Sequence, residues 1–170
     1  MIRRATYSDI DSIMGIIHGA QMSLYELGID QWQDNYPSRD VIMLDIEVGV
    51  GYVMCNNERV IGYAAIVLSG ECAYKQIDNL WQTGSNYVVV HRLCVDNNTR
   101  RQGVAIELMH YAANMARNEG YKGFRIDTHK GNIRMMSMMQ KFDFRHVGKI
   151  MYDSGEREAF ELDLDLSSIL

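Results

Sequence analysis

Two periods of hydrophobic and polar positions divide the chain into strands and helices. Residues 87–96 form a β-branched run that is apolar at nearly every position, which is typical of a strand covered on both faces. The segment after it has helical spacing and predicts a helix packed on a sheet, and Gly120 is well placed to end that helix. Its apolar row comprises Val104, Leu108 and Met115, with Ala105, Met109, Ala112 and Ala116 beside it.

The N-terminal pattern predicts a short strand followed by an amphipathic helix. Residues 2–6 can form the strand, and Ser8 or Asp9 then caps a helix whose apolar positions recur at helical spacing. Gly28 ends that region. The apolar positions are Ile10, Ile13, Ile16 and Ile17.

A polar loop, a second helix and a hairpin follow. Residues 31–37 combine a Trp, a Tyr and the only Pro of the chain, which indicates an ordered loop. A second capped helix starts near Ser38. Residues 51–55 and 60–68 read as two strands joined by a turn at Asn56-Asn57-Glu58.

The rest of the chain predicts a loop, a βα pair and a final hairpin. Residues 72–84 are polar and show no period, so they predict a loop of undefined shape. Residues 123–128 read as a strand, and a helix-like stretch runs from residue 132 to 144. Residues 145–152 and 156–166 are strands on either side of a turn, and the last strand alternates apolar and polar positions.

This order of elements predicts a mixed α/β sheet with helices on both faces. About seven strands are expected. No internal repeat, low-complexity tract or linker interrupts residues 1–170, and 47% of the residues are hydrophobic. We therefore expect one domain over residues 1–170, with enough apolar material for a core.

Charge and composition exclude several classes of protein. A formal net charge of −5 argues against a nucleic-acid-binding surface, which needs basic residues to neutralise phosphates. No apolar run approaches bilayer length, and the N-terminus lacks an apolar signal core. The odd number of cysteines without metal-ligand spacing predicts reduced thiols and a cytoplasmic location, with no metal. They are Cys55, Cys72 and Cys94.

The turn between the 87–96 strand and the following helix predicts an anion site. Free N–H groups of the first helical turn and the positive end of the helix dipole point at this turn. Gly103 would let a phosphate approach the backbone closely, and Arg100 and Arg101 would add charge-assisted hydrogen bonds. A nucleotide pyrophosphate suits such a site. Solvated arginines at an ordinary helix start are the alternative.

The flanks of this turn carry a resemblance to a known family. A second strand at residues 123–128 and Asn132 follow at a suitable distance, and a βαβ unit would join the two strands. The segment resembles the acyl-CoA pyrophosphate loop of the GCN5-related N-acetyltransferase (GNAT) family, and the resemblance covers nearly the whole chain. The motif reads Arg100-x-x-Gly103-x-Ala105 after a strand ending Leu93-Cys94-Val95.

The resemblance implies a GNAT fold, acetyl-CoA as cosubstrate and a site where the fourth and fifth strands splay apart. The backbone N–H of Val95 would polarise the acetyl carbonyl, and Asn132 would hydrogen-bond the pantetheine arm. The polar loop at residues 31–37 would help to build the acceptor site. The expected cofactor-binding residues are Leu93, Cys94, Val95, Arg100, Arg101, Gln102, Gly103, Val104, Ala105, Asn132 and Met136.

His91 is our candidate for the general base. It lies in the cofactor strand, two and four positions before Leu93 and Val95, and therefore on the same side of a regular strand. An imidazole titrates near neutral pH, which suits removal of a proton from an ammonium. Some arylalkylamine-type members carry a His at the corresponding position. A hydrogen-bonded structural histidine that holds Arg92 or a nearby loop is the alternative.

The helix after Asn132 departs from the family pattern. The family places a Tyr there as general acid to the departing thiolate, whereas this chain has Met139, which cannot donate a proton. Either another group or a water takes that role, or the thiolate leaves unaided. The groups in question are Ser137, His129 and Tyr152.

Three further residue groups have interpretations that compete with a functional role. The methionines at 135, 136, 138 and 139 are expected to fill a core rather than line a substrate wall. Cys94 is expected to be a small buried hydrophobe rather than a nucleophile. Asp127 and Thr128 end the fifth strand and are local hydrogen-bonding groups that stay candidates for the site.

The sequence therefore predicts an acetyl-CoA-dependent N-acetyltransferase. Its acceptor would be a primary amine of a small molecule, a peptide or a protein, with direct transfer in a ternary complex. A non-catalytic acyl-CoA-binding or sensor module is the alternative that the missing Tyr favours. A dinucleotide oxidoreductase is disfavoured, because the loop lacks the three-glycine spacing. The expected partners exclude nucleic acid and membrane, and a homodimer stays open.

Overall fold

The computed structural model describes residues 1–68 and 70–167. Within these residues, seven strands hydrogen-bond in the order β1-β2-β3-β4-β5-β7-β6. Parallel and antiparallel pairs both occur, so the expected mixed α/β sheet is confirmed. The chain divides into two compact units, Met1–Ile66 with Val90–Tyr111, and Val67–Val89 with Ala112–Leu170. The single domain expected over residues 1–170 stays a prediction.

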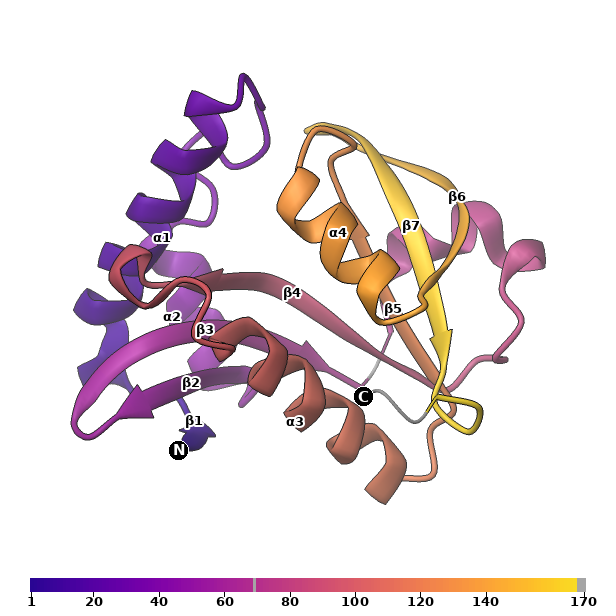
Figure 1. Ribbon diagram of the computed structural model, residues 1–170, viewed down its shortest axis with the longest axis horizontal. Helices are drawn as coiled ribbons and strands as arrows, with labels where there is room; N and C mark the ends of the chain where they lie inside the picture. The colour runs from indigo at the N-terminus through magenta and orange to yellow at the C-terminus, as the bar shows by residue number, and fades with distance from the viewer. Residues whose placement is uncertain (69, 168–170) are drawn as a thin grey trace. The chain divides into compact units, whose positions relative to one another are not determined.

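The first unit contains the N-terminal helices and the first hairpin (Figure 1). The β2–β3 turn is the predicted one, because Asn56 pairs with Arg59 and Asn57 adopts a left-handed conformation, with φ of 54°. The elements in chain order are β1 (Ile2–Arg4), η1 (Tyr7–Asp9), α1 (Ile10–Glu26), α2 (Arg39–Glu47), β2 (Gly51–Asn56), β3 (Arg59–Val67) and η3 (Asn97–Thr99).

Two elements run through both units. These are β4 (Tyr87–Val95) and α3 (Val104–Asn118). The second unit otherwise contains a 3-10 segment, one strand followed by one helix, and a hairpin. Its elements are η2 (Cys72–Leu80), β5 (Gly123–Thr128), α4 (Ile133–Lys141), β6 (Arg145–Tyr152) and β7 (Gly155–Asp163).

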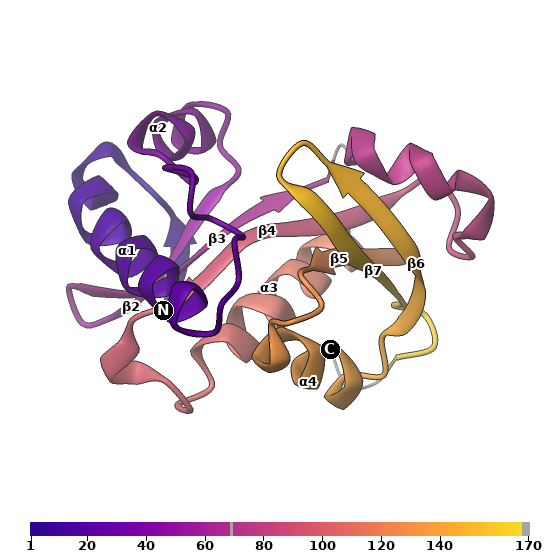
Figure 2. The same ribbon diagram turned by 90° about the horizontal axis from the view of Figure 1, so that it is seen from above.

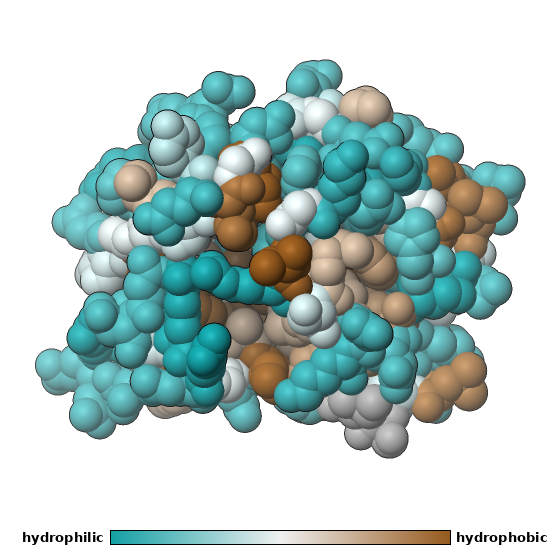
Figure 3. All heavy atoms as spheres, turned by 45° about the horizontal axis from the view of Figure 1, so that its top comes forward, coloured by the Kyte–Doolittle hydropathy of each residue, from teal (hydrophilic) through white to brown (hydrophobic). Residues whose placement is uncertain are grey.

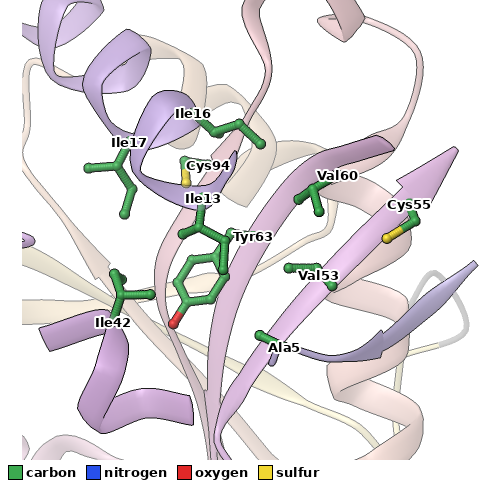
Figure 4. Close-up of a cluster of buried hydrophobic side chains, with 10 residues drawn as sticks. All are labelled: Ala5, Ile13, Ile16, Ile17, Ile42, Val53, Cys55, Val60, Tyr63 and Cys94. Atoms are coloured by element: carbon green, nitrogen blue, oxygen red, sulfur yellow. The ribbon is translucent and has the colours of Figure 1, made fainter. Parts of the chain in front are cut away.

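Helices α1 and α2 cover one face of the first unit's strands. The predicted isoleucine stripe of α1 is buried, and Ile13 and Ile17 have no exposed area. Figure 4 shows these side chains directed at Ile42 of α2 and at Tyr63 and Val53 of the strands. The apolar period of α1 therefore produces this core, because one helical stripe meets one strand face.

The first turn of α3 packs closely on β3 at Gly62. A Cβ at Gly62 would lie 2.6 Å from Cγ1 of Val104 and 3.2 Å from Cδ1 of Leu108. Gly62 and Tyr63 are consecutive strand residues and point to opposite faces, so α3 lies on the face opposite to α1 and α2. The missing side chain at Gly62 thus sets how closely the start of α3 approaches the strand.

The second unit packs α4 against antiparallel strands. Strand β7 lies between β5 and β6, with Phe124 paired to Leu162 and Ile150 to Arg157 (Figure 2). Phe124 and Phe144 meet edge to face, with ring centroids 5.3 Å apart. Tyr74, Val89, Ile150 and Ala159 form a buried apolar cluster in this unit.

A buried carboxylate joins the strands of the second unit to η2 and its following turn. Glu161 accepts hydrogen bonds from Thr83 Oγ1 at 2.7 Å, from Gln82 N at 2.9 Å and from Arg145 at 2.8 Å. Burial alone raises the pKa of Glu161, but these donors outweigh it, so the pKa lies below its usual value. Arg125 also contacts Glu161, at 3.4 Å.

Several element boundaries differ from those expected. Residues 72–80, expected as part of a loop, form the 3-10 segment η2, because Glu71 caps it through Ala73 N and Trp81 packs beside it. Strand β1 is shorter than the expected 2–6, since Ala5 and Thr6 leave it for the next turn. Strand β7 ends at Asp163 rather than at residue 166.

Asp9 is the N-cap residue of α1, one of the two expected, but its side chain makes no cap hydrogen bond to α1. Thr6 precedes a 3-10 turn, and the Asp9 carboxylate accepts the Thr6 backbone N–H at 2.8 Å and its hydroxyl at 2.9 Å. Arg3 donates two further hydrogen bonds to Asp9, at 2.7 and 2.8 Å. Asp9 thus acts as the returning carboxylate of a capping box.

Among residues 1–68 and 70–167, no helix has the length and apolar character needed to cross a bilayer.

On the face drawn in Figure 3, hydrophilic side chains surround small separate hydrophobic patches. Exposed large apolar residues such as Tyr25 and Leu44 are common on protein surfaces. We therefore assign no role to them individually.

Acidification is expected to remove the contribution of Asp9 to stability. The hydrogen bond from Arg3 lowers the pKa of Asp9 to about 2, whereas an unfolded aspartate titrates near 3.9. A lowered folded-state pKa stabilises the fold above the unfolded value, and this stabilisation is lost as the pH falls from about 5 through 2. Its full size is about 2 kcal/mol.

The measurement is urea unfolding of the wild type and Asp9→Asn across this pH range. The difference in the free energy of unfolding should shrink as the pH falls. Asp11→Asn is the control, because Asp11 forms an exposed ion pair with Arg39 that should contribute less than about 1 kcal/mol. A difference that is constant between pH 6 and pH 2 would contradict the role given to Asp9.

Candidate functional site

The loop that follows β4 is anchored to the neighbouring strand. Asp96 N donates to the carbonyl of Ile61 at 2.9 Å, and Thr99 Oγ1 donates to the carbonyl of Asp96 at 3.1 Å. The Asp96 carboxylate caps η3 by accepting Asn98 N at 2.9 Å, which with Arg59 lowers the pKa of Asp96. The loop therefore leaves the strand with a defined shape.

Two left-handed residues shape the backbone just before α3. Arg101 has φ of 64° and Gly103 has φ of 83°. Such turns can direct neighbouring backbone N–H groups toward one side and form an anion-binding concavity. Helix α3 begins at Val104, and the N–H groups of its first turn have no acceptor within the helix. The predicted anion site thus has the backbone that it requires.

The space beside Gly103 is open. No heavy atom outside its chain neighbours lies within 4 Å of an ideal Cβ at this position. A phosphate could therefore approach the backbone here without displacing a side chain. The glycine is also required by its positive φ, which other residues adopt at a cost.

The two arginines of the motif have different surroundings. Arg100 donates a hydrogen bond of 2.6 Å to Ser23 Oγ in α1, and Ser23 Oγ in turn donates to the carbonyl of Gly19 at 2.9 Å. Arg101 is exposed. Arg100 thus braces the loop against α1, a role that its place in the motif does not reveal. The backbone is the stronger candidate for binding an anion.

Strand β4 carries three of the residues expected to bind the cofactor, Leu93, Cys94 and Val95, and they differ in burial. Cys94 is 4% exposed and lies in the core between α1, α2 and the strands (Figure 4). Burial raises the pKa of the Cys94 thiol to about 12, so a thiolate is strongly disfavoured. Its expected character as a buried hydrophobe is confirmed. Leu93 and Val95 are half-buried.

A left-handed residue interrupts β4 next to His91. Arg92 has φ of 53° in the middle of the strand. A residue in this conformation disturbs the regular alternation of side chains, as in a β-bulge. The regular alternation that would place His91 on the side of Leu93 and Val95 therefore does not hold across Arg92. His91 is half-buried, and its role as base stays a prediction.

Asn132 and Met136, also expected to bind the cofactor, belong to the second unit. Asn132 caps α4, with its Oδ1 accepting Met135 N at 3.3 Å, so its side-chain amide nitrogen is the part suited to donate to a ligand. Met136 is half-buried. Met139, which stands in place of the family's Tyr, has no exposed area and fills the core, as expected.

Asp127 of β5 accepts two tyrosine hydroxyls. The hydroxyl of Tyr74 lies 2.9 Å from Asp127 Oδ2, and that of Tyr152 lies 3.2 Å from the same oxygen. Burial, together with the charge of Asp127, raises the pKa of Tyr74 well above its usual value. The expected local hydrogen-bonding role of Asp127 is thus observed, and the Tyr74 phenol stays a protonated donor.

Several site-shaping residues escape a reading of the sequence. Gly62 sets the approach of α3, and Asp45 forms a buried ion pair with Arg92, with Oδ1 2.6 Å from the guanidinium. The position of Arg92, a charged residue inside a buried β-branched run, indicates that it has a buried partner. The positions of Asp45 and Ser23 are ordinary polar positions of helices, and nothing in the sequence indicates their roles, because their partners are distant in sequence.

The first unit therefore contains His91, residues 93–95 and the loop 100–105, which all precede or begin α3. Comparisons with known proteins agree with this geometry. The profile of the family described as the acetyltransferase (GNAT) family matches residues 21–144. The chain belongs to this family and is an acetyltransferase, an enzyme of the acyltransferase class.

Individual relatives support the assignment. An acetyltransferase of the GNAT family from Streptococcus agalactiae 2603 is 30% identical, with a TM-score of 0.84 over 96% of this chain and 94% of that chain. An N-acetyltransferase from Staphylococcus aureus Mu50 shares the fold, with a TM-score of 0.71, 21% identity and coverage of 96% and 98%. The GNAT fold expected from the motif is thus confirmed.

A curated plant protein matches over a shorter stretch. It is the chloroplastic GCN5-related N-acetyltransferase 6 of Arabidopsis thaliana, 32% identical over 82 residues. The match covers 48% of this chain and 28% of the length of that protein. The shared part therefore identifies the family without extending to the rest of the plant protein.

Replacing Gly103 is expected to weaken binding of acetyl-CoA, the donor that the family generally uses. Gly103→Ala forces a Cβ into a left-handed conformation, with a cost of about 1–2 kcal/mol. Gly103→Glu adds a carboxylate that opposes the pyrophosphate and should abolish binding. Calorimetric titration of the folded variants measures both effects.

Gly28→Ala is the matched control. Gly28 has φ of 70° and likewise has open space at its Cβ, but it ends α1. This variant should lose a similar amount of stability and keep wild-type affinity for acetyl-CoA. Equal affinities in wild type and Gly103→Glu would remove the argument for this loop.

Proposed function

We propose that the protein transfers an acetyl group from acetyl-CoA to a primary amine of a small molecule, a peptide or a protein. Transfer would be direct, within a ternary complex. The observation that supports this most is the pair of left-handed residues, Arg101 and Gly103, immediately before the first turn of α3. Backbone N–H groups gathered at a helix start are suited to a pyrophosphate.

The residues present fit such a donor. Open space at Gly103 admits a phosphate to the backbone, and the exposed Arg101 adds positive charge near it. The amide nitrogen of Asn132 would donate to the pantetheine arm. The acyl end would lie beside Val95, near the end of β4.

Acyl transfer from a thioester to an amine requires few groups from the protein. Bound acetyl-CoA would supply an acyl group already activated as a thioester. The Val95 N–H would donate a hydrogen bond to the acetyl carbonyl oxygen and stabilise the charge that grows there. His91 would accept the proton of the acceptor ammonium, directly or through water, so that a neutral nitrogen attacks. Holding the two reactants in place supplies much of the remaining rate.

No tyrosine acid is included in this proposal. The hydroxyl of Tyr152 already donates its hydrogen bond to Asp127, at 3.2 Å, so it is engaged within the protein. The buried thioether of Met139 has no proton to give. When the C–N bond has formed and the C–S bond breaks, the thiolate can leave without a donor because a thiol is far more acidic than an amine or an alcohol. The second N–H proton of the attacking nitrogen passes to solvent.

The direct test is release of CoA from acetyl-CoA in the presence of a panel of amines. The panel would contain small diamines, arylalkylamines and peptides with free N-termini or lysines. Acceptor-dependent release with a stoichiometric acetylated product supports the proposal. Binding of acetyl-CoA without transfer to any amine would contradict it.

His91→Ala is expected to lower turnover more at pH 7 than at pH 9. At pH 7 an aliphatic amine is almost fully protonated and needs a base, whereas at pH 9 more of it is neutral. A general base contributes about a hundredfold. Steady-state rates across this range measure the effect, with His18→Ala on the exposed face of α1 as control. An equal loss at both pH values would leave His91 a structural role.

Met139→Ala is expected to cost stability rather than chemistry. Removal of a fully buried methionine leaves a cavity and should cost about 2–5 kcal/mol. Turnover per folded molecule should stay within about threefold, since no proton donor is lost. Chemical unfolding and kinetics on the same samples test this, with Met139→Leu as the volume-conserving control. A hundredfold loss of turnover in a folded variant would show that this position contributes to proton donation, which would contradict the proposal.

A further inference from the structure

The guanidinium of Arg92 is the centre of a buried polar cluster in the first unit. Its Nε donates to Asp45 Oδ2 at 2.8 Å, and a terminal nitrogen donates to Asp45 Oδ1 at 2.6 Å. The other terminal nitrogen donates to Tyr36 Oη at 2.9 Å. Tyr63 Oη donates to Asp45 Oδ2 at 2.6 Å. This cluster connects β4, α2, β3 and the loop 29–37.

The ion pair in this cluster is almost removed from solvent. The side chains of Arg92 and Asp45 are 13% and 7% exposed. Burial and the neighbouring Asp45 raise the pKa of Tyr63, so its phenol stays a hydrogen-bond donor. A two-point pair of this kind fixes the guanidinium in position and in orientation, which a single lysine contact cannot do.

The backbone of Arg92 is in an unfavourable conformation. With φ of 53°, it is left-handed within a strand, although it is neither Gly nor Asn. A residue with a Cβ populates this region about ten times less readily than glycine. Conformations of this kind persist only when the surroundings impose them. Among the described residues, Asp45 and Tyr36 make the contacts that hold Arg92 in this conformation.

We propose that Arg92 and Asp45 are positioning residues that hold the left-handed backbone of β4 at Arg92, which we call the bulge, and thereby orient residues 93–95. This inference rests on the proposed function, in which the Val95 N–H meets the acetyl carbonyl. The pair would act through the backbone, because the bulge decides which way the following N–H groups point. It explains why a strand of apolar residues contains a buried arginine at this position.

The hydrogen bond to Tyr36 gives the cluster a second consequence. Tyr36 lies in the loop 29–37, where Gln21 Nε2 also donates to its carbonyl at 3.0 Å. Arg92 would therefore position part of that loop as well as the strand. Loss of the Tyr36 hydroxyl should affect the loop alone, while loss of Asp45 should affect the strand and the loop together.

The first experiment compares Arg92→Gly with Arg92→Ala. Both remove the guanidinium, but glycine adopts the left-handed backbone without strain. We expect Arg92→Ala to bind acetyl-CoA about tenfold more weakly than Arg92→Gly, and Arg92→Lys to retain more affinity than Arg92→Ala. Arg39→Ala is the matched control. Arg39 lies on α2, the helix that carries Asp45, but its ion pair is exposed.

The outcomes of this comparison are distinct. If Arg92 had a merely structural role, both variants would melt at lower temperature while the folded protein kept wild-type affinity and kcat. That result would overturn the inference. A wild type that binds and transfers, with variants that bind less tightly in the stated order, supports it.

The second experiment separates the strand from the loop. Tyr36→Phe should raise KM for the acceptor amine severalfold and leave affinity for acetyl-CoA unchanged, with Tyr25→Phe on α1 as control. Asp45→Asn should weaken both. Equal effects of Tyr36→Phe on the two substrates would overturn the division of roles.

A third readout does not depend on acetyl-CoA. Asp45→Asn should accelerate amide hydrogen exchange in residues 91–96 by about tenfold relative to Arg39→Ala, because the bulge loses its restraint. Unchanged exchange there would refute the role of the pair even if the protein transfers acetyl groups. Faster exchange in a protein that binds no acetyl-CoA would instead refute the proposed function and leave the restraint in place.

Discussion

Each unit of this protein contains a buried carboxylate whose hydrogen-bonding capacity must be filled, and the elements that supply the donors are arranged around it. In the first unit Asp45 is met by Arg92 and Tyr63, and in the second Glu161 is met by Arg145, Thr83 and backbone N–H groups. An ion removed from water is tolerated only when its hydrogen-bonding capacity is filled by partners in good geometry. Each carboxylate therefore fixes the relative positions of several elements, because each element contributes a donor.

These two networks differ in what they hold. Glu161 ties a strand to the turn after η2, and Arg125 beside it lies over the rings of Tyr87 and Trp81, 3.7 and 4.2 Å from their centroids. That arrangement is a structural brace. Asp45 instead reaches a residue with a left-handed backbone in the strand that leads to the candidate anion loop. Its network thus acts on the geometry of the site as well as on stability.

The site itself depends on backbone more than on side chains. Arg100 braces its loop to Ser23, Cys94 and Val104 are buried, and the features that remain for an anion are left-handed turns and a helix start. Gly62 and Gly103 serve this arrangement in different ways, one by admitting α3 against the strand and one by leaving space for a ligand. A site made of backbone donors is suited to positioning a diphosphate without demanding a particular side chain.

The sequence by itself determined the types of the α-helices and β-strands, the hairpin turn at Asn57 and the loop motif between β4 and α3. These follow from local periods and from residues with restricted backbone preferences, which act over a few positions. Tertiary structure decided the length of β1, the packing around η2 and the bulge at Arg92, because each depends on partners distant in sequence. The bulge shows the reason most clearly: the left-handed backbone of Arg92 accompanies a bond to Asp45, 47 positions away, and only folding brings those two residues together.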